Sequence, residues 1–374
     1  MRLLVYLFII FSVVFSLFTL IRILLTFQLF DFVNVYYPSI QDILHGRNLY
    51  DNPATDVNYP PTTFLFLFPF GLIPIDIAQK IWTILSFSAL IGSIFVILKA
   101  VTKKFSLFTF LFIYSFSVLS FPVKFTLGMG QINLLLLLLI SLCFLFYQRK
   151  QFHIAGILLG IASGIKLIPL ILLLFFLRKK AFGVVGAALI TFVVLGTLGI
   201  LLFGEGLTRQ YLFEVLPNIP TSGNSVYYNQ ALTGFLARLA IPNEVASIIN
   251  YLLLGILLLI SFVVTNPKTK NISREFMEYG VFIIAILIGG GLAWQHHFVL
   301  LIIPYTTLLL SLFDGKEKRF SIHFIVLFIS YILVAFNIKT PQAFSGVSAF
   351  LLSHVFYGTV ILYGLSLKRL WLTK

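Results

Sequence analysis

Residues 149–180 read RKQFHIAGILLGIASGIKLIPLILLLFFLRKK, a long apolar stretch enclosed by two basic clusters. A single helical crossing would place these clusters on opposite sides of a membrane, although basic residues in short loops collect on the cytoplasmic side. Glycines and Pro169 also interrupt the apolar stretch. We therefore expect residues 153–177 to form a broken or re-entrant pair of short helices that enters the membrane and returns to the same side.

The remainder of the chain is similarly apolar. Of the 374 residues of the whole chain, 60% are hydrophobic and 10% are charged, whereas about 25% of the residues in a soluble protein are charged. About 20 apolar helical residues cross a bilayer. The sequence therefore predicts an all-α polytopic membrane protein with about ten transmembrane helices in a single domain, residues 1–374. The ten runs expected to span are Leu3–Phe27, Ile77–Leu98, Phe105–Val123, Ile132–Tyr147, Ala181–Phe203, Ala246–Val264, Gly280–Leu292, Phe298–Phe313, Phe320–Ala335 and Val347–Leu367.

The charge pattern predicts an orientation for these helices. The chain has 26 Lys and Arg against 12 Asp and Glu, a net charge of +14. With the broken pair returning to one side, 18 basic and four acidic residues face that side, while the other side has eight of each. We therefore expect a multi-pass protein of the cell membrane with both termini in the cytoplasm. Because the basic residues are scattered over short loops, the pattern does not favour a nucleic-acid partner.

The longest connection on the outer side, residues 28–61, contains several candidate functional residues. Asp31 follows the first apolar run at the depth of the membrane interface, where a carboxylate is costly and is therefore a candidate for function. A helix N-cap is an equally good explanation of this residue. Residues 33–44 have the pattern of an interfacial amphipathic helix. Tyr36 and Tyr59 are candidate substrate-binding residues, with anchoring in an aromatic belt as the alternative.

Two further candidate sites carry polar groups at helix ends or within apolar segments. Residues 127–133 read LGMGQIN, and Gln131 and Asn133 begin a helix whose N-terminus is expected to face outward. A helix N-terminus favours a phosphate, although a plain turn with a polar cap also explains these residues. Lys166 lies near the middle of the membrane and needs a partner or a water-filled cavity. It is a candidate for substrate binding, and the alternatives are a buried pair with Asp or Glu or a neutral amine.

The outer loop at residues 204–240 is expected to end in an interfacial helix. It offers Asn229, Gln230 and Arg238 as candidate substrate-binding residues. An arginine beside an apolar helix surface also commonly extends its guanidinium to the membrane surface without binding a ligand.

A late outer turn reads Trp294-Gln295-His296-His297. Adjacent histidines are candidate metal ligands, but no cysteine or carboxylate stands at a recognisable ligand spacing, so we expect no metal. Hydrogen bonding to an anionic substrate suits them better. Trp294 is either a stacking platform for a sugar or a residue of the aromatic belt.

Five segments of this chain, in order, resemble glycosyltransferase family 87, the polyprenol-phosphate-mannose-dependent mannosyltransferases of the GT-C superfamily. They are DFVNVYYPSIQDILHGRNLYDNPATDVNYPPTTFLFLFPFGLIP, GMGQINLLLLLLI, GIASGIKLIPLILLLFFLRKK, YYNQALTGFLARL and AWQHHFVLLIIPY.

The resemblance implies a GT-C fold with an extracytoplasmic active site. It implies a polyprenyl-phosphate sugar donor, with mannose as the expected sugar, a lipid-linked or cell-surface glycan acceptor, and no cofactor or metal. Asp31 would be the catalytic general base, and His296 or His297 would hold the donor phosphate or assist the leaving group. A single in-line displacement would invert the anomeric centre, by analogy with glycosidases.

Two other functions are compatible with an apolar polytopic chain. A transporter or flippase of lipid-linked sugars would place its essential polar groups near the membrane midplane. Here most candidate residues are expected on the outer side, with Lys166 alone in the middle. A glycan ligase or polymerase that uses a lipid diphosphate usually needs a larger outer loop than residues 204–229.

Overall fold

A computed structural model of the chain describes residues 2–26, 28–53, 55, 57–102, 104–219, 226–269, 271–314, 322–339 and 348–372. Within these ranges the chain is helical, and the one extended pairing is an isolated antiparallel bridge between Asn229 and Trp294. The elements in chain order are α1 (Arg2–Thr26), η1 (Phe32–Tyr36), α2 (Tyr37–Leu44), α3 (Pro61–Gly71), α4 (Ile75–Val101), α5 (Leu107–Leu119), α6 (Phe121–Met129), α7 (Asn133–Gln148), α8 (Phe152–Ile165), η2 (Ile168–Leu172), α9 (Leu173–Arg178), α10 (Phe182–Phe203), α11 (Glu205–Gln210), η3 (Tyr211–Val215), α12 (Leu216–Asn218), α13 (Leu232–Arg238), α14 (Asn243–Val264), α15 (Ile272–Gly289), η4 (Gln295–Leu301), α16 (Ile302–Asp314), α17 (Ile322–Ala335), α18 (Ser348–Leu351) and α19 (His354–Leu372).

Several helices are long and apolar enough to cross a membrane. In the described part of the chain there are five, or six if α5 and α6, which are bent by 67° at Ser120, count as one broken span. The five are Leu3–Thr26, Ile75–Val101, Phe182–Phe203, Asn243–Val264 and Gln295–Phe313. The chain is therefore a polytopic membrane protein. Helix length and composition do not support the predicted number of ten, because the other apolar runs fall on shorter or more charged helices such as α7, α15 and α17.

The stretch between the two basic clusters folds into α8, η2 and α9, with a break at Lys166. The backbone of Lys166 is extended, with φ −142° and ψ 136°. Residues that flank the stretch contact the same residue of α15: the hydroxyl of Tyr147, near the end of α7, donates to Glu275 at 2.9 Å, and Lys179 Nζ, in the second basic cluster, lies 3.1 Å from the Glu275 carboxylate. The stretch therefore returns to the end of the molecule where it began.

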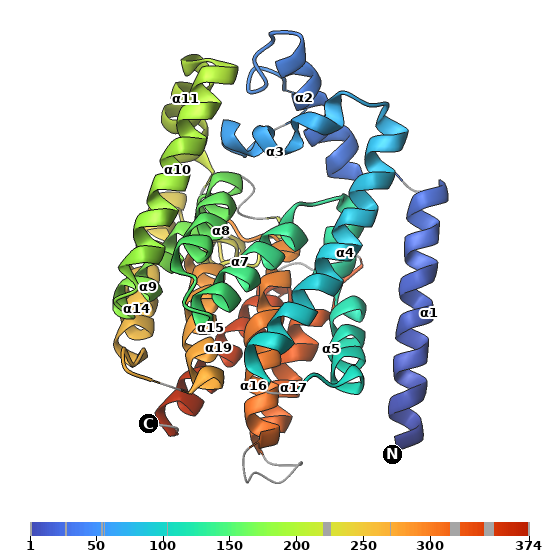
Figure 1. Cartoon of the computed structure of the whole chain (residues 1–374), viewed down its shortest axis with the longest axis vertical. Coiled ribbons are helices and arrows are strands. Elements are labelled where there is room, and N and C mark those ends of the chain that lie inside the picture. The colour runs from blue at the N-terminus through green and yellow to red at the C-terminus, as the bar shows by residue number, and fades with distance from the viewer. Residues whose placement is uncertain are drawn as a thin grey trace.

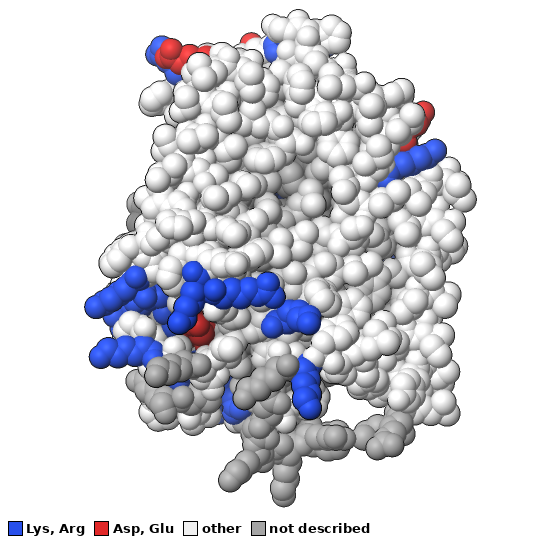
Figure 2. Space-filling view, viewed as in Figure 1, with Lys and Arg blue, Asp and Glu red and all other residues white. Residues whose placement is uncertain are grey.

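That end also carries the first turn of α1 and the last turns of α4, α7, α16 and α19. Arg274 of α15 lies 3.0 Å from Glu278 and donates to the main-chain oxygen of Leu370 at 2.8 Å, while Lys179 lies 2.6 Å from Glu278. Both chain termini lie at this end (Figure 1). On the face shown in Figure 2, most Lys and Arg side chains gather toward it. We call it the basic end, and the opposite end, which carries α2, α3 and α11, the loop end.

Candidate active site

A hydrogen-bonded cluster forms around Asp31, which directly precedes η1 at the loop end. The Gln131 amide nitrogen donates to Asp31 Oδ2, and the Gln131 amide oxygen accepts from the hydroxyls of Tyr59 at 2.7 Å and Tyr36 at 2.9 Å. These bonds give the amide a single orientation with its NH₂ group toward the carboxylate. Asp31 Oδ1 has no hydrogen-bond partner among the described residues.

Burial raises the pKa of the Asp31 carboxyl above its ordinary value. The hydrogen bond from Gln131 and the positive charge of Lys166 oppose this rise, because both stabilise the ionised form. Burial also raises the pKa of Tyr59. Tyr59 therefore stays a neutral donor toward Gln131, and Asp31 is the acidic group in this part of the cluster.

The position of Gln131 depends on the turn between α6 and α7. Gly130 has a positive φ of 72°, and a Cβ atom there would lie 2.9 Å from the Cβ atoms of Leu29 and Phe32. The indole nitrogen of Trp82 donates to the main-chain oxygen of Gly130 at 2.7 Å. Glycine is therefore required for the turn to approach the start of η1, which brings Gln131 within reach of Asp31.

Lys166 occupies the break between α8 and η2 and joins a second set of polar groups. Its Nζ atom donates to Asn133 Oδ1 at 2.9 Å and to His297 Nε2 at 2.9 Å, and it lies 5.0 Å from the centre of the Tyr59 ring. The contact with Tyr59 connects this set to the Asp31 cluster. Lys166 is thus partnered by neutral polar groups, and the alternative of a direct ion pair with Asp or Glu does not occur among the described residues.

Two threonines that sequence reasoning missed position this break. Thr62 and Thr63, in the first turn of α3, donate their hydroxyls to the main-chain oxygens of Gly164 and Ile165, the latter at 2.7 Å. They satisfy carbonyls left without a helical partner where α8 ends. Their signal in the sequence is weak, since two threonines after Pro60-Pro61 resemble any helix start.

The two histidines have different surroundings. Because Lys166 donates to His297 Nε2, a neutral His297 ring carries its proton on Nδ1. That atom has no hydrogen-bond partner among the described residues. The ring of His296 instead packs against Phe125 at 5.4 Å and Trp294 at 6.3 Å between centres. His297 is therefore the histidine that faces the polar cluster.

The remaining predicted site residues contribute to the scaffold behind this cluster. Asn229 Oδ1 accepts from the main-chain nitrogens of Ala231 and Ala293, and the Gln230 side chain donates to two main-chain oxygens. Arg238 donates to the Ser353 hydroxyl and to the main-chain oxygen of Asn229. Trp294 pairs with Asn229 through the backbone and stacks against Tyr228. The structure thus brings seven of the twelve predicted residues together, places His296 among aromatic rings, and has Asn229, Gln230, Arg238 and Trp294 in contact with other parts of the protein. The seven are Asp31, Tyr36, Tyr59, Gln131, Asn133, Lys166 and His297.

Comparison with known proteins identifies the family. Residues 58–289, more than half of the chain, match the model of glycosyltransferase family 87. The chain belongs to glycosyltransferase family 87. It is therefore an enzyme, a hexosyltransferase. The matched range contains Tyr59, Gln131, Asn133 and Lys166, whereas Asp31 and the histidines lie outside it.

Two curated relatives are similar along most of the chain. A Mycobacterium tuberculosis (strain CDC 1551 / Oshkosh) protein is 23% identical over 304 residues, 77% of this chain and 67% of its own length. A Mycolicibacterium smegmatis (strain ATCC 700084 / mc(2)155) protein is 26% identical over 287 residues, 73% of this chain and 68% of its own length. Both are named polyprenol-phosphate-mannose-dependent alpha-(1-2)-phosphatidylinositol pentamannoside mannosyltransferases.

Proposed function

We propose that this glycosyltransferase moves a mannosyl group from a polyprenyl phosphate to a hydroxyl of a lipid-linked or cell-surface glycan. The observation that supports this most is the close association of a carboxylate, Asp31, with a cationic group, Lys166, through Tyr59 and Gln131. Such a transfer needs both a base for the acceptor and a positive group for the departing phosphate. Membership of a glycosyltransferase family favours this reaction over transport of a lipid-linked sugar.

Asp31 acts as the general base. The acceptor oxygen attacks the anomeric carbon and forms the new glycosidic bond, while its proton passes to Asp31 Oδ1. The bond between the anomeric carbon and the phosphate oxygen breaks, and its electron pair leaves with the polyprenyl phosphate. A positioned carboxylate is useful because a sugar hydroxyl is a weak nucleophile near neutral pH.

The donor phosphate is held by the groups around Lys166. Asn133 is buried, its amide oxygen accepts from Lys166, and its amide nitrogen has no hydrogen-bond partner in the described part of the chain. Lys166, the Asn133 amide and the His297 Nδ1–H group are all hydrogen-bond donors, as a phosphate requires. Asn133 is also the first residue of α7, whose N-terminal dipole favours an anion. These groups stabilise the charge that grows on the leaving phosphate.

One carboxylate base and no covalent intermediate correspond to a single displacement with inversion. A β-linked donor then gives an α-linked product, in agreement with the alpha linkage in the names of both relatives. The reaction takes place at the loop end, which we assign to the extracytoplasmic face because basic residues gather at the other end.

Replacing Asp31 tests the assignment of the base. Asp31→Asn keeps the shape and the contact with Gln131 but removes the basic oxygen, so the rate of sugar transfer from polyprenyl phosphate should fall roughly 10²- to 10⁴-fold. Asp76→Asn, an exposed acid in the first turn of α4, is the matched control. Transfer by Asp31→Asn at the rate of the control would rule out Asp31 as the base.

The histidines can be distinguished by the same transfer assay. His297→Ala removes a donor at the proposed phosphate site, so kcat should fall at least about tenfold. His296→Ala removes ring packing and should change kcat less while lowering stability. A larger loss of kcat in His296→Ala than in His297→Ala would contradict the assignment.

A further inference from the structure

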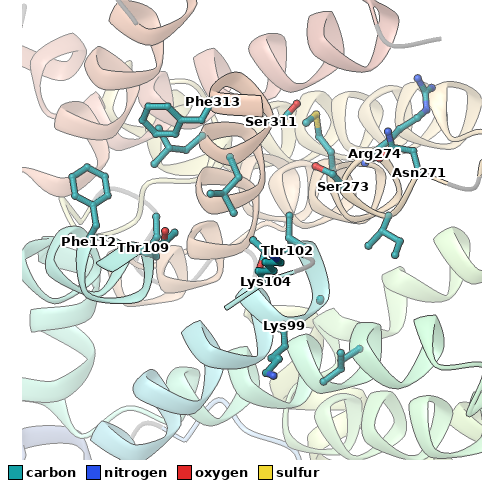
Figure 3. Close-up of a pocket in the computed structure, with 18 of the residues that line it drawn as sticks. Lys99, Thr102, Lys104, Thr109, Phe112, Asn271, Ser273, Arg274, Ser311 and Phe313 are labelled. Atoms are coloured by element: carbon teal, nitrogen blue, oxygen red, sulfur yellow. Dashed lines mark hydrogen bonds between the residues drawn. The ribbon is translucent and has the colours of Figure 1, made fainter. Parts of the chain in front are cut away.

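A cavity of about 1610 Å³ lies at the basic end, far along the helices from Asp31. It is lined by the last turns of α4, α7, α16 and α19, the first turns of α5, α15 and α17, and part of α1. Figure 3 shows Lys99, Thr102 and Lys104 across the cavity from Ser273, Arg274 and Ser311, with Phe112 on a third side. Its volume exceeds that of most small-molecule sites, which hold roughly 300–1,000 Å³.

The charge on the cavity wall has one sign. Five basic residues line it, and no Asp or Glu does so among the described residues. Arg274 and Arg369 already hold Glu278, Ser311 and main-chain oxygens. Lys99, Lys104 and Arg149 are exposed, and none of these three takes part in an ion pair with a described residue. Their charge is available to an anionic ligand.

A neutral donor adds to this charge. Gln148, the last residue of α7, lines the same cavity, and its buried side-chain nitrogen has no hydrogen-bond partner among the described residues. A buried amide without a partner is costly. A ligand that brings an acceptor oxygen to this nitrogen would remove that cost, and the basic residues of the same wall favour an oxyanion such as a phosphate.

The cavity continues into an apolar space. A second cavity of about 250 Å³ is lined almost entirely by apolar and aromatic side chains of α5, α16 and α17, together with residues of η4 and Pro122 of α6. The two cavities share wall residues, namely Phe112, Ile113, Leu309, Phe313 and Phe324. A free phosphate would use only the basic part of this space. A molecule with an anionic head and an apolar tail would use both parts.

We propose that this double cavity binds an anionic phospholipid, with the phosphate near Lys99, Lys104 and Arg149 and part of an acyl chain between α5 and α17. The lipid comes from the leaflet at the basic end, whereas the sugar donor of the proposed reaction binds at the loop end. The site is therefore separate from the transfer site, and it stands whether or not the assignment of Asp31 is correct.

Native mass spectrometry of the purified full chain tests this site, with phosphatidylglycerol and phosphatidylcholine of identical acyl chains as probes. The wild-type protein should retain phosphatidylglycerol preferentially. The triple variant Lys99→Gln, Lys104→Gln, Arg149→Gln should bind it roughly tenfold or more weakly, because each basic group contributes to anionic-lipid binding. The control variant Lys150→Gln, Lys180→Gln, Lys268→Gln loses the same charge from exposed positions that do not line the cavity, and should bind as the wild type does.

Thr109→Trp provides a second variant that leaves every charge in place. Thr109 lines the basic cavity, and an indole there fills space that the lipid needs, so phosphatidylglycerol binding should fall. Equal retention of both lipids by the wild type, or an equal loss in the control variant, would overturn the proposal. Displacement of phosphatidylglycerol by inorganic phosphate at the same concentration would show an anion site without a lipid, and would also overturn it.

Discussion

At the scale of single residues, the chemistry of the site depends on how Asp31 is held. Its carboxylate accepts from Gln131, which two tyrosine hydroxyls orient. Sequence reasoning left Asp31 undecided between a base and a helix cap. The structure has Asp31 at the cap position of η1 without a side-chain capping bond. Its side chain instead points to a group that comes 100 residues later, and no local pattern reports such a contact.

The raised pKa of Asp31 predicts how activity depends on pH. A base must be ionised, so kcat/KM should rise with pH through the pKa of Asp31, which burial places above the ordinary value of 3.8. Gln131→Leu removes a hydrogen bond that stabilises the ionised form, so the acidic limb should move up by about one pH unit. Tyr36→Phe removes hydrogen bonds to the Gln131 amide oxygen and to the Tyr59 hydroxyl but none to the carboxylate, so it should move the limb less. An acidic limb that stays in place in Gln131→Leu would show that another group controls it.

At the scale of the elements, α8 owes its position to close packing on α10. The sequence predicts that residues 153–177 form a broken pair of helices, and it treats the glycines of this stretch as points where the helix is interrupted. In the structure α8 is continuous through Gly156 and Gly160, and the break comes at Lys166. A Cβ atom at Gly160 would lie 2.6 Å from Thr191 Cβ and 2.7 Å from the main-chain oxygen of Ala188. Small residues four apart allow two membrane helices to approach in this way.

Gly160→Ala should therefore separate α8 from α10. We expect a loss of about 1–3 kcal/mol in the free energy of unfolding, the usual effect of overpacking. Because α8 ends at Lys166, transfer activity should fall as well. Gly196→Ala, in α10, is the control, since a Cβ atom there meets nothing within 4 Å. Thermal unfolding in detergent measures both, and equal stability of the two variants would contradict the close packing.

At the scale of the whole molecule, the apolar runs and charges of the sequence predicted the fold class better than local patterns predicted the residues of the candidate site. Composition was sufficient for an all-helical membrane protein, and the basic clusters around residues 149–180 predicted that this segment returns to its starting end. The number of spans was not predictable, since helices such as α7 and α15 are short or charged yet buried within the bundle. Asn229 and Arg238 have side chains that could bind a ligand. Only the fold shows that these side chains form hydrogen bonds with main-chain groups and with the Ser353 hydroxyl.

The orientation of the molecule in the membrane is open to a direct test with cysteine labelling. The single cysteine, Cys143, is buried, so an added cysteine reports alone. Glu205→Cys lies at the start of α11 at the loop end, and Lys268→Cys lies at an exposed position near the basic end. With basic loops in the cytoplasm, a membrane-impermeant maleimide should label Glu205→Cys in intact cells and Lys268→Cys only after permeabilisation. The reverse pattern would move the Asp31 cluster to the cytoplasmic face, where an extracytoplasmic glycan does not reach it.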